Sequence, residues 1–269
     1  MKYILVTGAY GGMGRATVSA LVAQGYGVFA LDRQVGKPSE NVYPIAADVT
    51  DSASLAAAAD VVAKVTDKLF AVVHFAGVYM MDSLVEMEES AFRRIVDINL
   101  TGAYLVNKTF AHMLGNGSRI VITTSELAPL DPLPFTGIYA VTKAALDKYA
   151  YSLAMELQLL GIKVSVLRAG AVQTDMLGAS TTALDSFCAK TALYTCNAAR
   201  FKNIVDSVEA KSVPPTKIAA KVTKILGKRN PKFAYAVNRN PMLCMLNVLP
   251  KRVQLWAIKQ VLKTKPNNT

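Results

Sequence analysis

Residues 2–24 read KYILVTGAYGGMGRATVSALVAQ, and this stretch decides the fold. Residues 2–7 are an apolar run typical of a buried strand, and residues 15–24 carry a helical pattern. A glycine-rich turn joins them. Its glycines let the backbone approach a pyrophosphate, which the N-terminus of the following helix receives. The stretch therefore predicts a dinucleotide site that includes Gly8, Gly12, Met13 and Gly14.

Strand-like and helix-like segments alternate along the rest of the chain. Further strands are expected at residues 27–31, 42–46, 69–73, 119–124, 162–167 and 233–237. Helices are expected at residues 52–66, 138–160, 216–228 and 251–263, and one or two helices at residues 88–114. This alternation predicts an α/β fold, a doubly wound, Rossmann-like parallel sheet in three α/β/α layers. Residues 1–240 are expected to form a single domain, in which 177–215 is a flexible or helical flap, and 241–269 an apolar and basic C-terminal extension.

Composition narrows the class of protein. A length of 269 residues with 52% hydrophobic content suits one large domain. No apolar run reaches the 18 residues of a spanning helix, and Met1 leads into a strand without signal-peptide architecture, so a cytoplasmic protein is expected. Three cysteines without metal or CxxC spacing indicate reduced thiols. With only two histidines in the chain, a histidine-based metal site is not expected.

The net charge of +11 is concentrated at one end of the chain. Residues 200–269 hold 15 basic and two acidic side chains, whereas residues 1–199 are slightly acidic. In the helix expected at 251–263, Arg252, Lys259 and Lys263 share one side. Two interpretations stay open: peripheral contact with an anionic membrane, or packing of the apolar residues on a second subunit or over a lipophilic pocket. Nucleic-acid binding is not expected, because no recognised module accompanies the charge.

The residues at the end of the second strand indicate whether the cofactor is NAD or NADP. Asp32 lies 18 residues after Gly14, where a carboxylate accepts both hydroxyls of an adenine ribose and repels a 2′-phosphate. This favours NAD over NADP. The following residue, Arg33, leaves NADP as the alternative, since a guanidinium clasps phosphate.

A second chemical signal lies in Ile-Tyr-Ala-Val-Thr-Lys, residues 138–143. Tyr139 and Lys143 are four residues apart and share one helix face. A positive charge near a phenol lowers its pKa, so the pair is suited to proton transfer. Ser125 ends the fifth strand and is the preferred hydroxyl partner, with Thr124 as its rival.

These motifs, in this order, resemble the short-chain dehydrogenase/reductase family in its single-domain form. The resemblance covers about residues 1–240. It rests on the TGxxxGxG-like loop, the Asp48-Val49 pair, Asn99, the set of Ser125, Tyr139 and Lys143, and the segment 168–174. Four departures are visible. His74-Phe75 replaces two asparagines before Ala76-Gly77, Ala169 replaces a proline, Ser125 lies one residue further from Tyr139 than is common, and the glycine spacing also fits sugar-nucleotide epimerases.

The resemblance implies an oxidoreductase that transfers a hydride between NAD(H) and an alcohol or ketone. Tyr139 is then the general acid or base, Lys143 lowers its pKa and binds ribose, Ser125 bonds the substrate oxygen and Asn99 holds a relay water. The implied cofactor contacts are Asp48, Val49, Ala76, Gly77, Tyr139, Lys143, Val172 and Thr174. The extension and flap suggest a bulky, lipophilic, hydroxysteroid-like substrate. The alternatives are a cofactor sensor or scaffold without turnover and a sugar-nucleotide epimerase or dehydratase. A homodimer or homotetramer through residues 99–114 and 138–160 is also expected.

Overall fold

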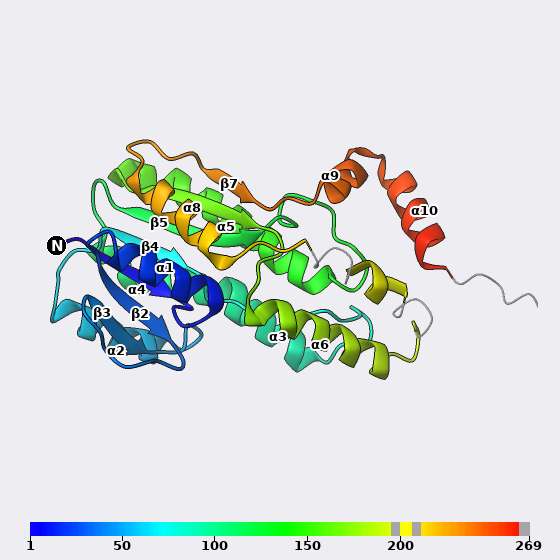
Figure 1. The fold of residues 1–269 in the computed structure, drawn as a ribbon, viewed down its shortest axis with the longest axis horizontal. Helices are drawn as coiled ribbons and strands as arrows, with labels where there is room; N and C mark the ends of the chain where they lie inside the picture. Colours follow the sequence, from blue (N-terminus) through cyan, green and yellow to red (C-terminus); the bar gives the residue numbers. More distant parts are fainter. Residues whose placement is uncertain (195–199, 206–210, 264–269) are drawn as a thin grey trace, which may run out of the picture.

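A seven-stranded parallel sheet organises the computed structural model, which describes residues 1–194, 200–205 and 211–263. The strand order is β3-β2-β1-β4-β5-β6-β7, and every neighbouring pair is parallel (Figure 1). The strands are β1 (Tyr3–Thr7), β2 (Gly27–Asp32), β3 (Val42–Ala46), β4 (Ala71–His74), β5 (Arg119–Ser125), β6 (Lys163–Ala169) and β7 (Ala234–Val237). The predicted doubly wound sheet is confirmed, with strand bounds within about two residues of expectation.

Helices cover both faces of the sheet, which gives the three layers. One face carries α1 (Gly12–Val22) and α8 (Pro215–Gly227), and the other carries α2 (Ser52–Ala63), α4 (Gly102–Phe110) and α5 (Gly137–Leu157). The alternation of side chains along a strand explains how the core divides. Ile4 and Val6 pack toward α1 and α8, whereas Leu5 packs toward α2 and α4. Because both faces are buried, the strands read as continuous apolar runs.

The remaining helices lie beyond the carboxyl edge or lead to it. They are α3 (Glu89–Val96), α6 (Asp175–Lys190), α9 (Pro241–Val248) and α10 (Lys251–Leu262). Short turns of other helix types occur at Asp97–Thr101 (π), Ala111–Met113 (3₁₀) and Gln158–Leu160 (3₁₀). No helix of the described residues has both the length and the apolar character needed to cross a bilayer.

Two segments differ from the sequence prediction. The helical region 88–114 is interrupted by the π-helical turn around Asn99. The run after Asn240 forms α9, a helix that we did not predict. Its signals were present, because the Asn240 side chain accepts a hydrogen bond from Met242 N and Pro241 occupies the first turn. The predicted flap at 177–215 is helical in α6 and at 200–205, and residues 195–199 and 206–210 lie outside the described residues.

Candidate active site

The carboxyl ends of the strands bring the predicted residues to one edge of the sheet. Two adjoining cavities lie there, of about 330 Å³ and about 200 Å³. The larger is lined by the glycine loop, Asp32, Asp48, Val49, Ala76 and Gly77. The smaller is lined by Ser125, Tyr139, Lys143 and Val172, together with many apolar side chains. Met13, Gly77 and Thr174 border both, so a molecule in one cavity meets a molecule in the other.

At two positions of the glycine loop, a side chain would collide with the backbone. Gly8 has φ of +64°, and a Cβ there would lie 2.6 Å from Ala76 N. A Cβ on Gly14 would lie 2.1 Å from the carbonyl oxygen of Gly8. The following helix, α1, has no side-chain cap at its N-terminus. Its first N–H groups therefore face the larger cavity as donors for an anion such as a pyrophosphate.

The far end of the larger cavity carries the carboxylate predicted to select the cofactor. Asp32 Oδ2 accepts a hydrogen bond of 2.9 Å from Tyr10 N, and Oδ1 accepts one of 2.8 Å from Arg33 N. These bonds fix the carboxylate at the cavity wall. Arg33 lines the same wall, so a guanidinium that suits the 2′-phosphate of NADP lies beside the Asp32 carboxylate.

Ser125 and Tyr139 meet in the smaller cavity. The Ser125 hydroxyl and the Tyr139 phenol both line this cavity, and Ser125 acts to lower the pKa of Tyr139. Lys143, one helical turn further along α5, donates from Nζ to the Thr123 carbonyl over 3.4 Å. The rival hydroxyl of Thr124 donates instead to Asp147, 3.2 Å away. Since strand residues alternate in direction, Thr124 and Ser125 cannot both face Tyr139, and the structure places Ser125 there.

Burial moves the pKa values of both α5 residues toward their neutral forms. It raises the pKa of Tyr139 to about 12, and the nearby Glu126 carboxylate adds to the rise. Burial also lowers the pKa of Lys143 to about 8. The expectation that Lys143 brings the Tyr139 pKa down is therefore wrong for the protein alone. Desolvation of the half-buried phenol outweighs the attraction of an ammonium whose own charge is disfavoured.

Asn99 has a structural contact that the sequence did not predict. Its Oδ1 accepts from Val78 N over 2.8 Å, while Nδ2 donates to Val78 O and to Thr142 Oγ1. Both amide hydrogens are thus used within the protein, and the side chain clamps the segment after β4. The expectation that Asn99 also holds a relay water stays a prediction. This clamp keeps Gly77 beside Lys143, because a Cβ on Gly77 would lie 3.3 Å from Nζ.

Two polar residues near the site have structural roles. His74 is buried with a pKa lowered to about 4 by desolvation, and its Nε2 donates to Asn107 Oδ1 over 2.9 Å. His74 is thus a neutral ring that joins β4 to α4 in place of the usual asparagine. Arg168 forms a two-bond ion pair with Asp147 of α5, at 2.7 Å and 3.0 Å.

Sequence reasoning missed Glu126, which follows Ser125 and lines the smaller cavity. Burial raises the pKa of this carboxyl, and a hydrogen bond of 2.6 Å from Asn240 N partly offsets the rise. Glu126 thereby joins the end of β5 to the start of α9. A polar residue directly after a strand-end serine was the available signal, but its partner is 114 residues away.

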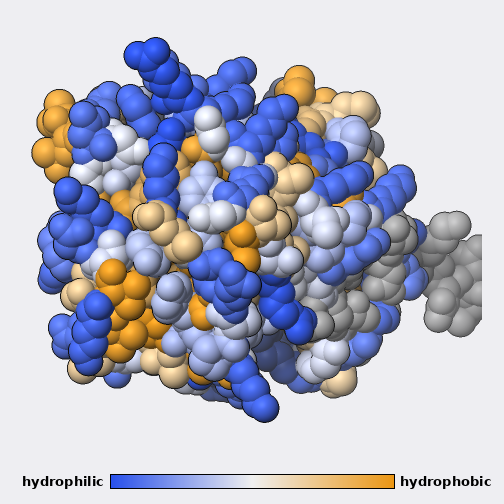
Figure 2. Space-filling view, turned by 60° about the vertical axis from the view of Figure 1, so that its left-hand side comes forward, coloured by the Kyte–Doolittle hydropathy of each residue, from blue (hydrophilic) through white to orange (hydrophobic). Residues whose placement is uncertain are grey.

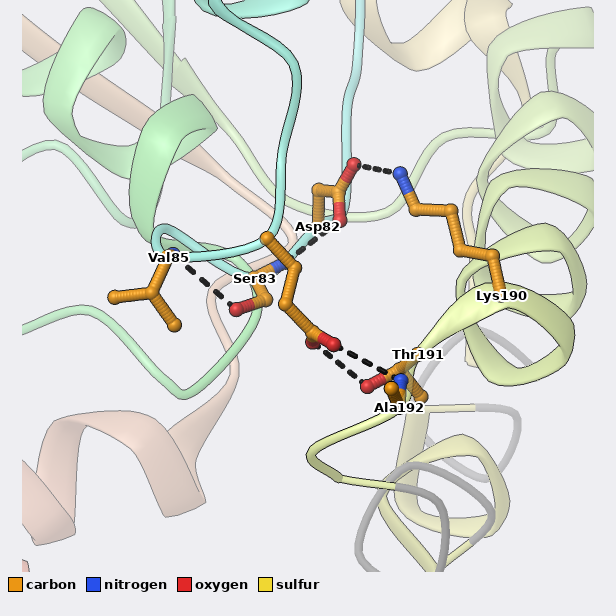
Figure 3. A network of polar contacts seen from close by, with 7 residues as sticks. Asp82, Ser83, Val85, Lys190, Thr191 and Ala192 are labelled. Atoms are coloured by element: carbon orange, nitrogen blue, oxygen red, sulfur yellow. Dashed lines mark hydrogen bonds and ion pairs between the residues drawn. The ribbon is translucent and has the colours of Figure 1, made fainter.

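The outer wall of the site is held in place by a polar network between α6 and the segment after β4 (Figure 3). Asp82 pairs with Lys190 at the end of α6, over 2.5 Å. Glu86 accepts from the Thr191 hydroxyl over 2.7 Å and from the backbone of Ala192 over 2.9 Å. Part of the predicted flap is therefore attached to the body of the domain.

A family model described as short chain dehydrogenase matches residues 2–185 of the chain. This is more than half of the sequence and includes the glycine loop, Asn99, Ser125, Tyr139 and Lys143. The chain belongs to the short-chain dehydrogenase/reductase family.

Similar proteins within this family carry the names of different substrates. A 3-ketodihydrosphingosine reductase of Bacteroides thetaiotaomicron is 26% identical over 96% of this chain and 97% of its own length. An NADPH-dependent 1-acyldihydroxyacetone phosphate reductase of Schizosaccharomyces pombe is 29% identical over 64% of this chain. Estradiol 17-beta-dehydrogenase 2 of Mus musculus is 32% identical over 66% of this chain. The matches span only 60% and 50% of the lengths of these last two.

Solved structures support the fold alone. A short chain dehydrogenase family protein from Francisella tularensis superposes with a TM-score of 0.74 at 21% identity, covering 89% of this chain and 98% of that protein.

Proposed function

We propose that the protein is an NAD-dependent oxidoreductase that reduces a ketone on a long, lipophilic substrate. The observation that carries the proposal is the position of Ser125, Tyr139 and Lys143 where the smaller cavity adjoins the larger one. The larger cavity has the glycine loop and α1 N-terminus that suit a dinucleotide, which supplies the hydride when bound. The smaller cavity then receives the ketone.

The charge states of the site support reduction as the direction. With a pKa of about 12, Tyr139 is a neutral phenol near pH 7 and holds the proton that the substrate oxygen needs. Ser125 donates a second hydrogen bond to that oxygen as negative charge develops on it. Lys143, with a pKa of about 8, is still charged and favours the phenolate that remains after transfer. The products are the alcohol and the oxidised cofactor.

The apolar walls of the smaller cavity support a lipophilic substrate. Met81, Leu133 and Phe201 face it, together with Met242 and Leu243 of α9. A long chain is favoured over the hydroxysteroid expected earlier, because the relative named for 3-ketodihydrosphingosine matches along its whole length. The relative named for estradiol matches over half of its own. NAD is proposed from the Asp32 carboxylate, although the Schizosaccharomyces pombe relative is named as NADPH-dependent.

The test is a turnover assay on the full chain with NADH or NADPH and two ketones, 3-ketodihydrosphingosine and estrone. We expect loss of nicotinamide absorbance with NADH and the long-chain ketone. Tyr139→Phe should lower kcat by about a thousandfold and leave the NADH dissociation constant within about twofold. Near-normal turnover in Tyr139→Phe would remove the proton-donor assignment. A preference for NADPH or for estrone would overturn the corresponding part of the proposal.

A further inference from the structure

Helices α9 and α10 form an arm that extends from the carboxyl edge of the sheet (Figure 1). The inner side of this arm is docked on the domain. Leu243 is buried against the smaller cavity, and Leu262 packs with Leu184 and Phe187 in the cluster above the site. Polar contacts add to this, because Asn247 accepts from Asp131 N over 2.6 Å. These contacts on its inner side hold the arm against the domain.

The outer side of α9 is an apolar stripe exposed to solvent. Met242, Met245 and Val248 follow the spacing of one helix face, and Leu249 follows at the C-terminal cap; the four are between 41% and 84% exposed. No residue of α9 is charged. Elsewhere, the end of the molecule that carries the N-terminus is mostly hydrophilic, with apolar groups scattered across it (Figure 2). A continuous apolar stripe of this kind indicates a surface that is covered by a partner.

The outer side of α10 adds positive charge to the same arm. Arg252 and Lys259 share one side of the helix, flanked by exposed Leu255 and Trp256, and Lys263 follows at the C-terminal cap. None of the three cations has an ion-pair partner among the residues that the structure describes. The chain contains no aspartate or glutamate after Glu209. The partner of this surface therefore offers both negative charge and an apolar phase.

We infer that the α9–α10 arm docks on an anionic membrane surface. The α9 stripe enters the boundary of the acyl chains. The cations Arg252, Lys259 and Lys263 lie among the headgroups, where long basic side chains and tryptophan are favoured. A second copy of this chain is disfavoured as the occupant. In a twofold interface the same patch faces itself, which would bring three cations against three cations with no carboxylate in the arm to pair with them.

The arm also connects the membrane to the site. Met242 is 57% exposed and at the same time lines the smaller cavity, so that cavity reaches the surface at α9. Docking places this opening against the lipid. If the proposed function holds, a long-chain ketone then passes from the membrane to Ser125 and Tyr139 without crossing water.

The experiment is co-sedimentation of the full chain with phosphatidylcholine vesicles, with or without about 30 mol% phosphatidylserine. We expect binding to the anionic vesicles that weakens as salt is raised. Trp256 is the only tryptophan of the chain, so its fluorescence should shift to shorter wavelength on binding. Met245→Ser/Val248→Ser and Arg252→Gln/Lys259→Gln should each weaken binding by about tenfold or more, at roughly 1 kcal/mol for each basic residue near the surface.

The control is Lys217→Gln/Lys224→Gln, which removes two exposed charges from α8 and should bind like the unmodified chain. Absence of binding to anionic vesicles at low salt would overturn the proposal. If the α8 variant lost vesicle binding to the same extent, the vesicles would be attracting the net charge of the protein and not the arm. This result would also overturn the proposal. Self-association that Met245→Ser/Val248→Ser abolishes would assign the surface to a second copy. Vesicle binding needs no turnover, so a failure of the proposed substrate leaves this result unaffected.

Discussion

Replacing Lys143 with methionine should stabilise the protein while removing its activity. The Lys143 ammonium is buried, and burial lowers its pKa from 10.5 to about 8. A shift of this size corresponds to about 3 kcal/mol by which the folded state disfavours the charged form at neutral pH. Methionine has a similar length and no charge. Loss of the 3.4 Å hydrogen bond to the Thr123 carbonyl opposes the gain by about 1 kcal/mol, so we expect about 2 kcal/mol of net stabilisation.

The pH dependence of the folding stability provides an independent check on the sign of this effect. The folded protein releases the Lys143 proton near pH 8, whereas the unfolded chain holds it until about pH 10.5. Within this window the unfolded state binds more protons, so the stability of the unmodified protein rises with pH. The advantage of Lys143→Met should therefore be present below pH 8 and disappear as the pH approaches about 10.5.

The assay is urea unfolding of the cofactor-free protein at a series of pH values between about 7 and 10. Lys148→Met is the matched control, because Lys148 lies on the same helix and is exposed; its stability should change by less than about 0.5 kcal/mol. Turnover of Lys143→Met should fall by at least about a hundredfold. A variant that is less stable than the unmodified protein at pH 7, or a stability difference that does not vary with pH, would refute the reasoning.

Three further predictions concern the rest of the site. Asp32→Ala removes the carboxylate that repels a 2′-phosphate, so the ratio of kcat/KM for NADH over NADPH should fall by about tenfold or more; an unchanged ratio would contradict the role of Asp32. The pKa of His74 is lowered to about 4, so the folded state loses stability as pH falls below about 6.5; His74→Gln should flatten this loss in acid-unfolding curves, and an unchanged slope would assign the loss to other groups. Gly14→Ala places a Cβ 2.1 Å from the Gly8 carbonyl oxygen and should abolish NADH binding in titration calorimetry. In Gly11→Ala the new Cβ lies 3.5 Å from its nearest neighbour, so the NADH dissociation constant should stay within about threefold of that of the unmodified protein. Equal binding by both variants would contradict the need for a glycine at position 14.

The fold was predictable because both of its signals are local. Apolar runs of strand length alternate with helical patterns, and the glycine turn after β1 fixes the direction of the first unit. Tyr139 and Lys143 were predictable for the same reason, since four residues on a helix determine a shared face. The preference for Ser125 over Thr124 followed from its position at the end of β5, and the Thr124 hydroxyl bonds Asp147 instead.

The parts that could not be predicted depend on long-range contacts. Glu126 joins Asn240, and Asn99 joins Val78 and Thr142, across separations that no local pattern encodes. The π-helical turn at Asp97–Thr101 orients the Asn99 amide toward the segment after β4, and its sequence carries no distinctive signal. Helix α9 was missed for a different reason. Its apolar content suggested packing without a defined element, although Asn240 and Pro241 marked a helix start.

The wrong expectation for the pKa of Tyr139 shows that the identity of two neighbouring residues does not give their degree of solvation. Two residues on one helix face establish that a charge is near a phenol, and this alone would lower the pKa of the phenol. Whether the charge or the burial prevails depends on how much water remains around the pair, and that is set by β5 and by the segment after β4. In this protein Lys143 is buried and Tyr139 is half-buried, and desolvation acts on both, so the phenol keeps its proton and the ammonium is poorly solvated. A site in that state is prepared to donate a proton rather than to accept one. In the proposed reduction, the same burial that makes Lys143 unfavourable for stability therefore keeps on Tyr139 the proton that the substrate oxygen receives.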